Sequence, residues 1–434
     1  MFVLRAESTN KIKSGSMDYL AKNLLFFFLL AQLFLGSFSA SGQTYPCYLY
    51  GSITTVDGDV YQGAIRWDDE EVFLSDMFNA EKEENPYLKY LPESKERISY
   101  ERNSKKRSWD RFEVTINDER RNTTSIYDRK FQCRFGDIKS ISVTGSESVS
   151  LELKDGKYIN LTGGSNDVGT KVWIIDQELG LLKIDWERIE IVNFKTPAAN
   201  NVETFGEPIY GKLTTTKGEF TGFIQWDHDE RLAGDILDGR GRDGDLAIPF
   251  SKIKTIEKTE RGSLITLNSD RQLELTGEND VNKYNRGIIV SIPKVGRIDL
   301  PWSHFLSLEI LPRLVSNNDC LSEYKVSERL FGTLVTKGGK SYKGFIVYDL
   351  DEAMDSEVLN GLNDELEFFV PFRNIASIEP MAYNYCLVEL KNGMKLYLGD
   401  QTDVSNKNAG VIVFINKDEY QNFKWEDIER IDFM

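Results

Sequence analysis

Histidine is almost missing from this chain, which has 434 residues but only two histidines, His228 and His304. Metal sites built from several histidines and catalytic relays that depend on histidine are therefore hard to assemble, and we expect no enzyme. Positive charge is also scarce, with 53 Lys and Arg against 69 Asp and Glu and a net charge of −16. Binding to phosphates needs clustered Lys and Arg, so we expect no nucleic-acid partner.

Long hydrophobic runs are absent apart from one near the N-terminus. Residues 24–35 form a 12-residue run in which only Gln32 is polar, and Lys22 precedes it. The run is too short to cross ~30 Å of hydrocarbon. It predicts that residues 1–42 are a signal peptide with preceding residues, cleaved after Gly42; an uncleaved anchor is the alternative. The mature chain is then secreted or periplasmic, without an integral membrane span.

Cysteine is also sparse, with four residues at positions 47, 133, 320 and 386. Export would allow disulfides, and four cysteines permit three pairings. One hypothesis pairs Cys47 with Cys133 and Cys320 with Cys386. The alternative is four free thiols that serve as small buried hydrophobes.

What the chain does have is internal repetition. The hydrophobic fraction of 40% is sufficient for packed cores, and the length suits roughly three domains. One pattern occurs three times, with glycines, threonines and an aromatic-aspartate pair in the same order. Its copies are GSITTVDGDVYQGAIRWD at 51–68, GKLTTTKGEFTGFIQWD at 211–227 and GTLVTKGGKSYKGFIVYD at 332–349.

A second pattern also occurs three times, and both patterns end in an aromatic residue followed by apolar residues at steps of three. The copies of the second pattern are LELKDGKYINLTGGSNDV at 151–168, ITLNSDRQLELTGENDV at 265–281 and VELKNGMKLYLGDQTDV at 388–404. A step of three is typical of a 3₁₀ turn, here leading into a last strand. The aromatic residues are Phe135, Phe250 and Phe372 in one type and Trp186, Trp302 and Trp425 in the other.

Alternating apolar residues and turn signals such as Asp57-Gly58 predict an all-β fold. Half-units of about 50 residues, among them 147–194 and 208–257, end in turns such as Val370-Pro371-Phe372. This arrangement resembles the SH3-like and Sm-like small β-barrels. The resemblance implies three tandem repeats, each a pair of five-stranded barrels, and it implies no function. The predicted repeats are residues 43–195, 207–310 and 329–434.

Acidic clusters follow the aromatic residue of the first pattern in all three copies. Carboxylates around a turn are the ligands that Ca²⁺ prefers, which makes these clusters candidate cation sites. The alternative is a solvated turn in an acidic protein. The candidate ligands are Asp68, Glu71 and Asp76, then Asp227, Glu230 and Asp235, and then Asp349, Glu352 and Glu357.

A carboxylate pair could also hydrolyse glycosides. Threefold recurrence argues against catalysis, because a catalytic centre normally occurs once. The turns at Asp167, Asp280 and Asp403 of the second pattern are predicted to form a recurrent loop whose Asp or Asn binds its own backbone, and a ligand loop is the alternative.

One insertion, at about residues 79–130, has no counterpart in the other repeats. It is rich in charge of both signs and includes Lys105, Lys106, Arg107 and Trp109, which we take as candidate binding residues. A short charged helix is predicted at residues 93–107. The alternative is a partly disordered excursion.

These features together predict an exported, non-catalytic binding or scaffolding protein. The expected partner is a protein, a peptide or an envelope glycan. A secreted hydrolase that uses one acidic cluster and a Ca²⁺-stabilised surface protein are the alternatives.

Overall fold

The structure is a computed structural model, and it describes residues 48–91, 130–163, 167–197, 203–312, 324, 326–382 and 384–434. Within these ranges it consists of strands, turns and short 3₁₀ helices, so the prediction of an all-β protein is confirmed. A helix with the length and hydropathy of a membrane span does not occur in those ranges. The predicted signal peptide, Cys47 and Cys320 lie outside them.

Ten strands of the first sequence repeat form one sheet, in the order β4-β3-β7-β6-β5-β10-β1-β2-β8-β9. Every second side chain of β6 is buried, as expected for a strand with one face on a core. The strands are β1 (Tyr50–Thr55), β2 (Val60–Trp67), β3 (Met77–Lys82), β4 (Lys130–Arg134), β5 (Ile138–Gly145), β6 (Ser148–Leu153), β7 (Tyr158–Thr162), β8 (Val172–Asp176), β9 (Gly180–Ile184) and β10 (Ile189–Phe194).

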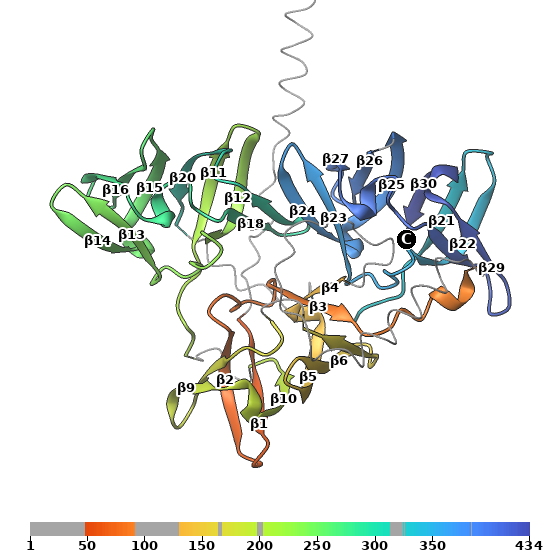
Figure 1. Cartoon of the computed structure of the whole chain (residues 1–434), viewed down its shortest axis with the longest axis horizontal. Helices are drawn as coiled ribbons and strands as arrows, with labels where there is room; N and C mark the ends of the chain where they lie inside the picture. The colour runs from red at the N-terminus through yellow and green to blue at the C-terminus, as the bar shows by residue number, and fades with distance from the viewer. Residues whose placement is uncertain are drawn as a thin grey trace, which may run out of the picture. The chain divides into compact units, whose positions relative to one another are not determined.

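The second and third sequence repeats, drawn in green and blue in Figure 1, supply an 18-stranded sheet and the separate hairpin β13–β14. The strands of the second are β11 (Tyr210–Thr215), β12 (Gly218–Trp226), β13 (Ile236–Gly241), β14 (Gly244–Pro249), β15 (Ile253–Lys258), β16 (Ser263–Leu267), β17 (Gln272–Leu275), β18 (Ile288–Ile292), β19 (Gly296–Leu300) and β20 (Phe305–Ile310). Those of the third are β21 (Phe331–Thr336), β22 (Ser341–Val347), β23 (Val358–Asn363), β24 (Leu366–Pro371), β25 (Ile375–Ala382), β26 (Tyr385–Leu390), β27 (Lys395–Gly399), β28 (Val411–Phe414), β29 (Tyr420–Phe423) and β30 (Ile428–Phe433).

Strands pair across the two halves of each sequence repeat. In the first, β1 pairs with β2 and β10, and β2 pairs with β8. Strands β3 to β7 lie between β2 and β8 in the chain. They pair among themselves, and β5 also pairs with β10. The corresponding pairs are β11–β20, β12–β18 and β15–β20 in the second, and β21–β30, β22–β28 and β25–β30 in the third.

Two details of the predicted architecture are wrong. The sheets are open, so closed five-stranded barrels are not formed. The half-units are also not separate, because strand β12 of residues 208–257 pairs with β18 of the following half. Apolar periodicity and turn glycines indicate where strands run, but they do not specify which distant strand is the partner.

Aromatic side chains occupy the centre of each core. The predicted 3₁₀ turns are confirmed as η2 (Phe135–Asp137), η3 (Trp186–Arg188), η4 (Phe250–Lys252), η7 (Phe372–Asn374) and η9 (Trp425–Asp427), and Trp302 lies in a turn before β20. The other 3₁₀ helices are η1 (Leu88–Tyr90), η5 (Asn279–Val281) and η8 (Thr402–Val404). The aromatic residue at the end of each copy of the first pattern is buried, and its ring meets a tryptophan of the second pattern edge-on. The centroid distances are 6.1 Å for Trp67–Trp186, 5.9 Å for Trp226–Trp302 and 5.9 Å for Tyr348–Trp425.

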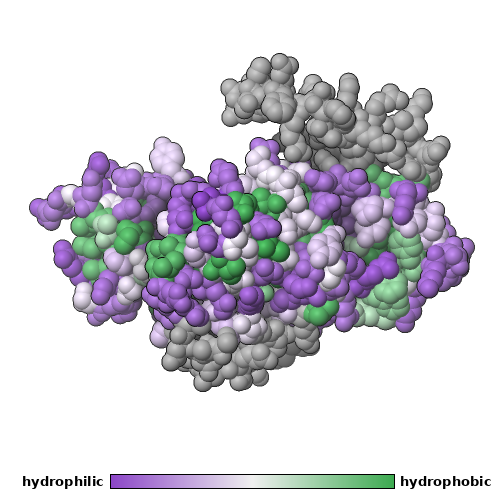
Figure 2. Space-filling model, turned by 90° about the horizontal axis from the view of Figure 1, so that it is seen from below, coloured by the Kyte–Doolittle hydropathy of each residue, from purple (hydrophilic) through white to green (hydrophobic). Residues whose placement is uncertain are grey.

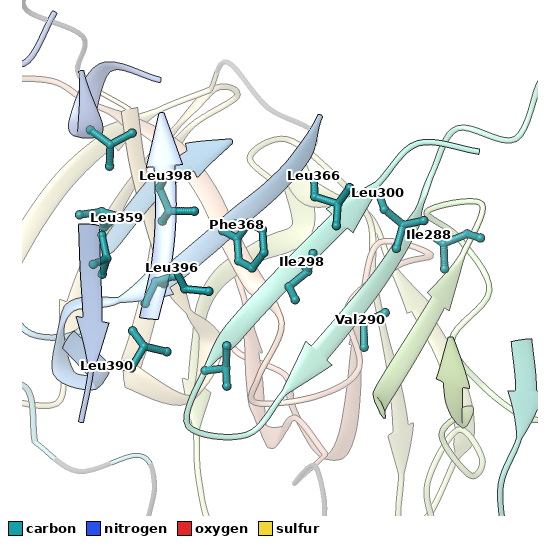
Figure 3. Close-up of a cluster of buried hydrophobic side chains, with 14 of the residues drawn as sticks. Ile288, Val290, Ile298, Leu300, Leu359, Leu366, Phe368, Leu390, Leu396 and Leu398 are labelled. Carbon is teal, nitrogen blue, oxygen red and sulfur yellow. The ribbon is translucent and has the colours of Figure 1, made fainter. Parts of the chain in front are cut away.

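The second and third sequence repeats share one core. Strand β19 pairs with β24, which places Ile298 opposite Phe368. Figure 3 shows Ile298 and Leu300 beside Leu366 and Phe368 in a continuous cluster of buried side chains. The first repeat has a core cluster of its own.

The predicted insertion at residues 79–130 is an enlarged hairpin turn. Strands β3 and β4 pair directly, with Asn79 opposite Gln132 and Glu81 opposite Lys130. The corresponding hairpins β13–β14 and β23–β24 close with two-residue turns, so the strands at the ends of the insertion have counterparts and the residues added between them do not. Residues 92–129, which include the predicted helix and Lys105, Lys106, Arg107 and Trp109, lie outside the described residues.

The described start of this enlarged turn packs against the third repeat. Tyr87, Tyr90 and Leu91 pack on a buried cluster that includes Val347 and Ile412. The Asn422 side-chain amide donates a hydrogen bond to the Tyr90 carbonyl at 2.8 Å. This segment is therefore a structural tether between two repeats.

Cys133 and Cys386 are free thiols, each buried in a core cluster. The hypothesis that they pair with Cys47 and Cys320 is therefore wrong. Burial raises the pKa of both thiols, which keeps them protonated and unreactive. Their role is packing, as small hydrophobic side chains.

Close approach of strands explains one recurring glycine of the first pattern, and it makes a prediction. A Cβ at Gly344 would lie 2.1 Å from the carbonyl oxygen of Phe414 on the neighbouring strand. We expect Gly344→Ala to lower the free energy of unfolding by about 1–3 kcal/mol, because the strands must separate. Gly338→Ala is the control, since its nearest atom would be 3.8 Å away. Urea denaturation that gives both variants equal stability would contradict this explanation.

Candidate functional site

The three acidic clusters are tight turns that we call the acidic turns, residues 67–71, 226–230 and 348–352. In the first, the backbone N–H of Trp67 donates to the Glu71 carbonyl at 2.8 Å, and that of Glu71 donates to the Trp67 carbonyl at 3.1 Å. The aspartate after the aromatic residue has a positive φ in each turn, which Asp tolerates better than most residues. These angles are 52° at Asp68, 48° at Asp227 and 44° at Asp349.

The carboxylates of these aspartates bind nearby polar groups. Asp68 lies 3.6 Å from the Lys171 ammonium. Asp227 accepts a hydrogen bond from the Asn279 side chain. Asp349 accepts one from the backbone N–H of Ala409. The recurrence of aspartate therefore has a structural explanation in turn geometry and loop attachment.

A second set of acids caps the turn that follows each acidic turn, and we call Asp76, Asp235 and Glu357 the capping acids. One carboxylate oxygen of each accepts hydrogen bonds from two consecutive backbone N–H groups. A carboxylate that accepts several backbone N–H groups replaces the water lost on burial. The donors are Val72 and Phe73 at 2.7 and 2.8 Å for Asp76, Arg231 and Leu232 at 2.7 and 2.8 Å for Asp235, and Ala353 and Met354 at 2.6 and 2.9 Å for Glu357.

A third set, which we call the locking aspartates, comes from the second sequence pattern. The backbone carbonyl of each locking aspartate accepts a hydrogen bond from the side chain of the aromatic residue that begins an acidic turn. The distances are 2.9 Å for Trp67–Asp167, 2.8 Å for Trp226–Asp280 and 2.6 Å for Tyr348–Asp403. Each carboxylate accepts from the backbone of a neighbouring strand. These donors are Asn79, Asp238 and Asn360, at 2.7, 2.7 and 2.6 Å. Each locking aspartate is thus bound to a strand distant in sequence. Asparagines of the same loops bind their own backbone as predicted, because Asn285 accepts from the Gly287 N–H at 3.1 Å and Asn408 accepts from the Gly410 N–H at 2.9 Å.

The last residue of each acidic turn is a glutamate with a buried oxygen. Among the residues that the structure describes, Oε2 of Glu71, Glu230 and Glu352 has no hydrogen-bond partner. Burial, reinforced by the nearby locking aspartate, raises the pKa of Glu71 and Glu352 well above the usual range and that of Glu230 to about 9. Glu230 is therefore protonated at neutral pH.

Buried cations from other repeats neutralise two of the capping acids. Arg231 Nη2 lies 2.6 Å from Asp76 Oδ1, and both side chains are at most 3% exposed. Lys82 Nζ lies 2.7 Å from Glu357 and 3.1 Å from Asp351. Burial opposes the charge on Lys82, but these carboxylates outweigh it and raise its pKa. The acids thus connect the first repeat to the second and third.

The predicted cation sites do not find support in this geometry. No three His, Cys, Asp or Glu side chains within the described ranges are arranged to hold a metal ion. A cavity of about 110 Å³ beside Asp349, Glu352 and Asp403 is small compared with the ~300–1,000 Å³ typical of ligand sites. The contacts described above attach the acidic turns to other parts of the fold.

A larger cavity lies in the third repeat, and none of the residues that line it was among the candidate site residues of the sequence analysis. We call it the Trp425 cavity; its volume is about 490 Å³, within the range of ligand sites. On the face seen in Figure 2, hydrophobic groups lie scattered among hydrophilic residues. The cavity is lined by Lys337, Pro380, Met381, Asn406, Asn408, Ala409, Lys424, Trp425 and Glu426.

One sequence difference could have indicated this cavity. Pro380 and Met381 of the third repeat align with Lys258 and Thr259 of the second. The predicted binding residues Lys105, Lys106, Arg107 and Trp109 lie outside the described residues. Comparison with models of protein families and with curated proteins finds no match.

The raised pKa of Glu230 predicts a pH dependence of stability. The pKa of Glu230 is about 9 in the folded protein, above its usual value of 4.5. The folded state then binds more protons than the unfolded state between these values, so stability falls as pH rises through this window. Glu230→Gln removes this loss.

We expect the free energy of unfolding of Glu230→Gln minus that of the unchanged protein to be larger at pH 8 than at pH 5. Urea denaturation at the two pH values measures it. Glu219→Gln, at an exposed ion pair with Lys212, is the control and should show little pH effect. A Glu230→Gln difference that is the same at both pH values would show that the carboxyl group is ionised throughout.

Proposed function

We propose that this protein is an exported, non-catalytic binding or scaffolding protein whose partner is a peptide, a glycan or a component of the cell envelope. The observation that carries the proposal is the Trp425 cavity, which has the volume of a ligand site and is lined by exposed hydrogen-bond donors and apolar side chains. The short apolar segment at residues 24–35 supports export.

The use of the acidic residues supports a non-catalytic role. A hydrolase needs a carboxylate pair that faces its substrate. Here the capping acids accept backbone hydrogen bonds, and Glu71 and Glu352 are buried. The capping acids are thus occupied in holding the fold together.

The scaffold in this proposal is a set of three structural repeats related to SH3-like or Sm-like domains. In the first repeat, β10-β1-β2-β8-β9 are neighbours, and η3 directly precedes β10. This order of five strands with a 3₁₀ turn before the last one supports the relation. Repeats that contact one another suit a protein that presents a surface to a partner.

The proposal is tested in the cells that produce the protein. The full chain with a C-terminal tag is compared with a chain that lacks residues 1–42, by fractionation and by chemical crosslinking followed by mass spectrometry. We expect the full chain in the periplasm or medium, beginning at Gln43, and crosslinked to an envelope or extracellular partner that the truncated chain does not capture.

The same purified chain is then incubated with glycoside, peptide and ester reporter substrates, and we expect no turnover. Retention of the full chain inside the cell would contradict export. Turnover that Glu352→Gln abolishes, while Glu230→Gln leaves it intact, would instead identify a hydrolase with one active copy.

A further inference from the structure

The Trp425 cavity is open because of a difference between the second and third repeats. In the second repeat, Lys258 Nζ lies 5.7 Å from the ring centroid of Trp302 and donates to the carbonyls of Trp302 and Ser303 at 2.6 and 3.1 Å. The lysine therefore covers the tryptophan. Pro380 stands at the equivalent position of the third repeat and has no side chain that could reach across.

The equivalent tryptophan of the first repeat is satisfied within the chain. The indole N–H of Trp186 donates to the Gly145 carbonyl at 3.1 Å. Within the described ranges, the indole N–H of Trp425 has no hydrogen-bond acceptor, and the residue is 6% exposed. The indole N–H of Trp425 can thus donate to a ligand in the cavity, whereas that of Trp186 in the first repeat donates to a carbonyl of the protein.

Two ammonium groups and the indole N–H of Trp425 supply hydrogen-bond donors to this cavity. The Lys337 backbone is fixed by a 3.0 Å hydrogen bond to the Asp427 carbonyl, while its ammonium has no ion-pair partner among the described residues. Lys424 lies 3.6 Å from Glu426, with both side chains more than 70% exposed. Such an exposed pair is weak, so Lys424 is available to a ligand. A ligand that fits must offer acceptors, and a carboxylate meets two ammonium groups best.

The apolar walls favour a peptide over a sugar. A sugar ring needs a wide exposed aromatic face, and Trp425 is almost completely buried. Met381 is 51% exposed, and its flexible thioether adapts to apolar side chains of different shape. Pro380 forms a rigid wall beside it.

We propose that the Trp425 cavity binds a peptide segment in which a carboxylate side chain stands next to an apolar one. The carboxylate lies between Lys337 and Lys424, and the apolar side chain contacts Pro380 and Met381. This assignment rests on the proposed binding function and names its ligand class. In the second repeat, Lys258 occupies the equivalent place beside Trp302.

Fluorescence anisotropy with the full mature chain tests the assignment. The probes are a library of fluorescein-labelled, amidated pentapeptides with a central glutamate and varied neighbours, the same library with glutamine, and a labelled oligoglucuronate. We expect the best glutamate peptides to have apolar neighbours and to bind at least about tenfold tighter than their glutamine counterparts. The oligoglucuronate should not compete.

Two variants locate the binding. Pro380→Lys restores the lysine of the second repeat and should weaken binding at least about tenfold by filling the cavity. Lys337→Glu, at an exposed position, should do the same by repelling the carboxylate. Lys340→Glu, on the same hairpin turn but outside the cavity lining, is the matched control and should change affinity less than about twofold. Thermal unfolding confirms that all three variants are folded.

Each other result overturns the assignment. Equal binding of glutamate and glutamine peptides, unchanged affinity in Lys337→Glu, preference for oligoglucuronate, or no peptide binding at all would each show that the cavity is not an acidic-peptide site. If the peptide assignment fails but the full chain still crosslinks to an envelope partner, the proposed binding function remains supported. Retention inside the cell or turnover of a reporter substrate would defeat the proposed function itself.

Discussion

Buried carboxylates that must find hydrogen-bond donors are the constraint on which this structure depends. Each repeat carries a capping acid that binds two backbone N–H groups, and each such bond to a charged group contributes about 1.5–3 kcal/mol. Each also carries a locking aspartate that connects a buried aromatic side chain to a strand distant in sequence. Turn, core and sheet are therefore held by the same few acids, which explains why acidic residues recur at matched positions.

The same acids hold repeats to one another where a partner repeat supplies a cation. Arg231 pairs with Asp76, and Lys82 pairs with Glu357. Arg231 stands where the other two repeats have Val72 and Ala353, so one substitution in a repeated pattern created a contact between repeats. Breaking a buried pair of this kind costs about 3–5 kcal/mol, because the remaining charge stays buried. Divergence among repeats thus produces both the assembly and the Trp425 cavity.

Local features were predictable from the sequence, whereas long-range pairing was not. Alternating apolar residues and steps of three predicted the strands and the 3₁₀ turns, because both patterns reflect the geometry of a few consecutive residues. The partner of β2 is β8, which lies about a hundred residues away, and nothing in the local pattern specifies it. The acidic turns were found as a recurring motif, but their role depends on distant donors. The Trp425 cavity depends on the absence of a lysine at Pro380, which becomes informative only when Lys258 is seen covering Trp302.

The central claim, that buried ion pairs of the capping acids connect the repeats, is tested most directly by a double-mutant cycle on Lys82 and Glu357. Lys82→Met keeps the aliphatic stem, and Glu357→Gln keeps an oxygen for the backbone cap. Unfolding free energies of both single variants, the double variant and the unchanged protein give the coupling energy. We predict about 1–3 kcal/mol, with the double variant less destabilised than the sum of the two single variants. Additive losses would show that the pair contributes nothing to the contact between repeats and would contradict the account.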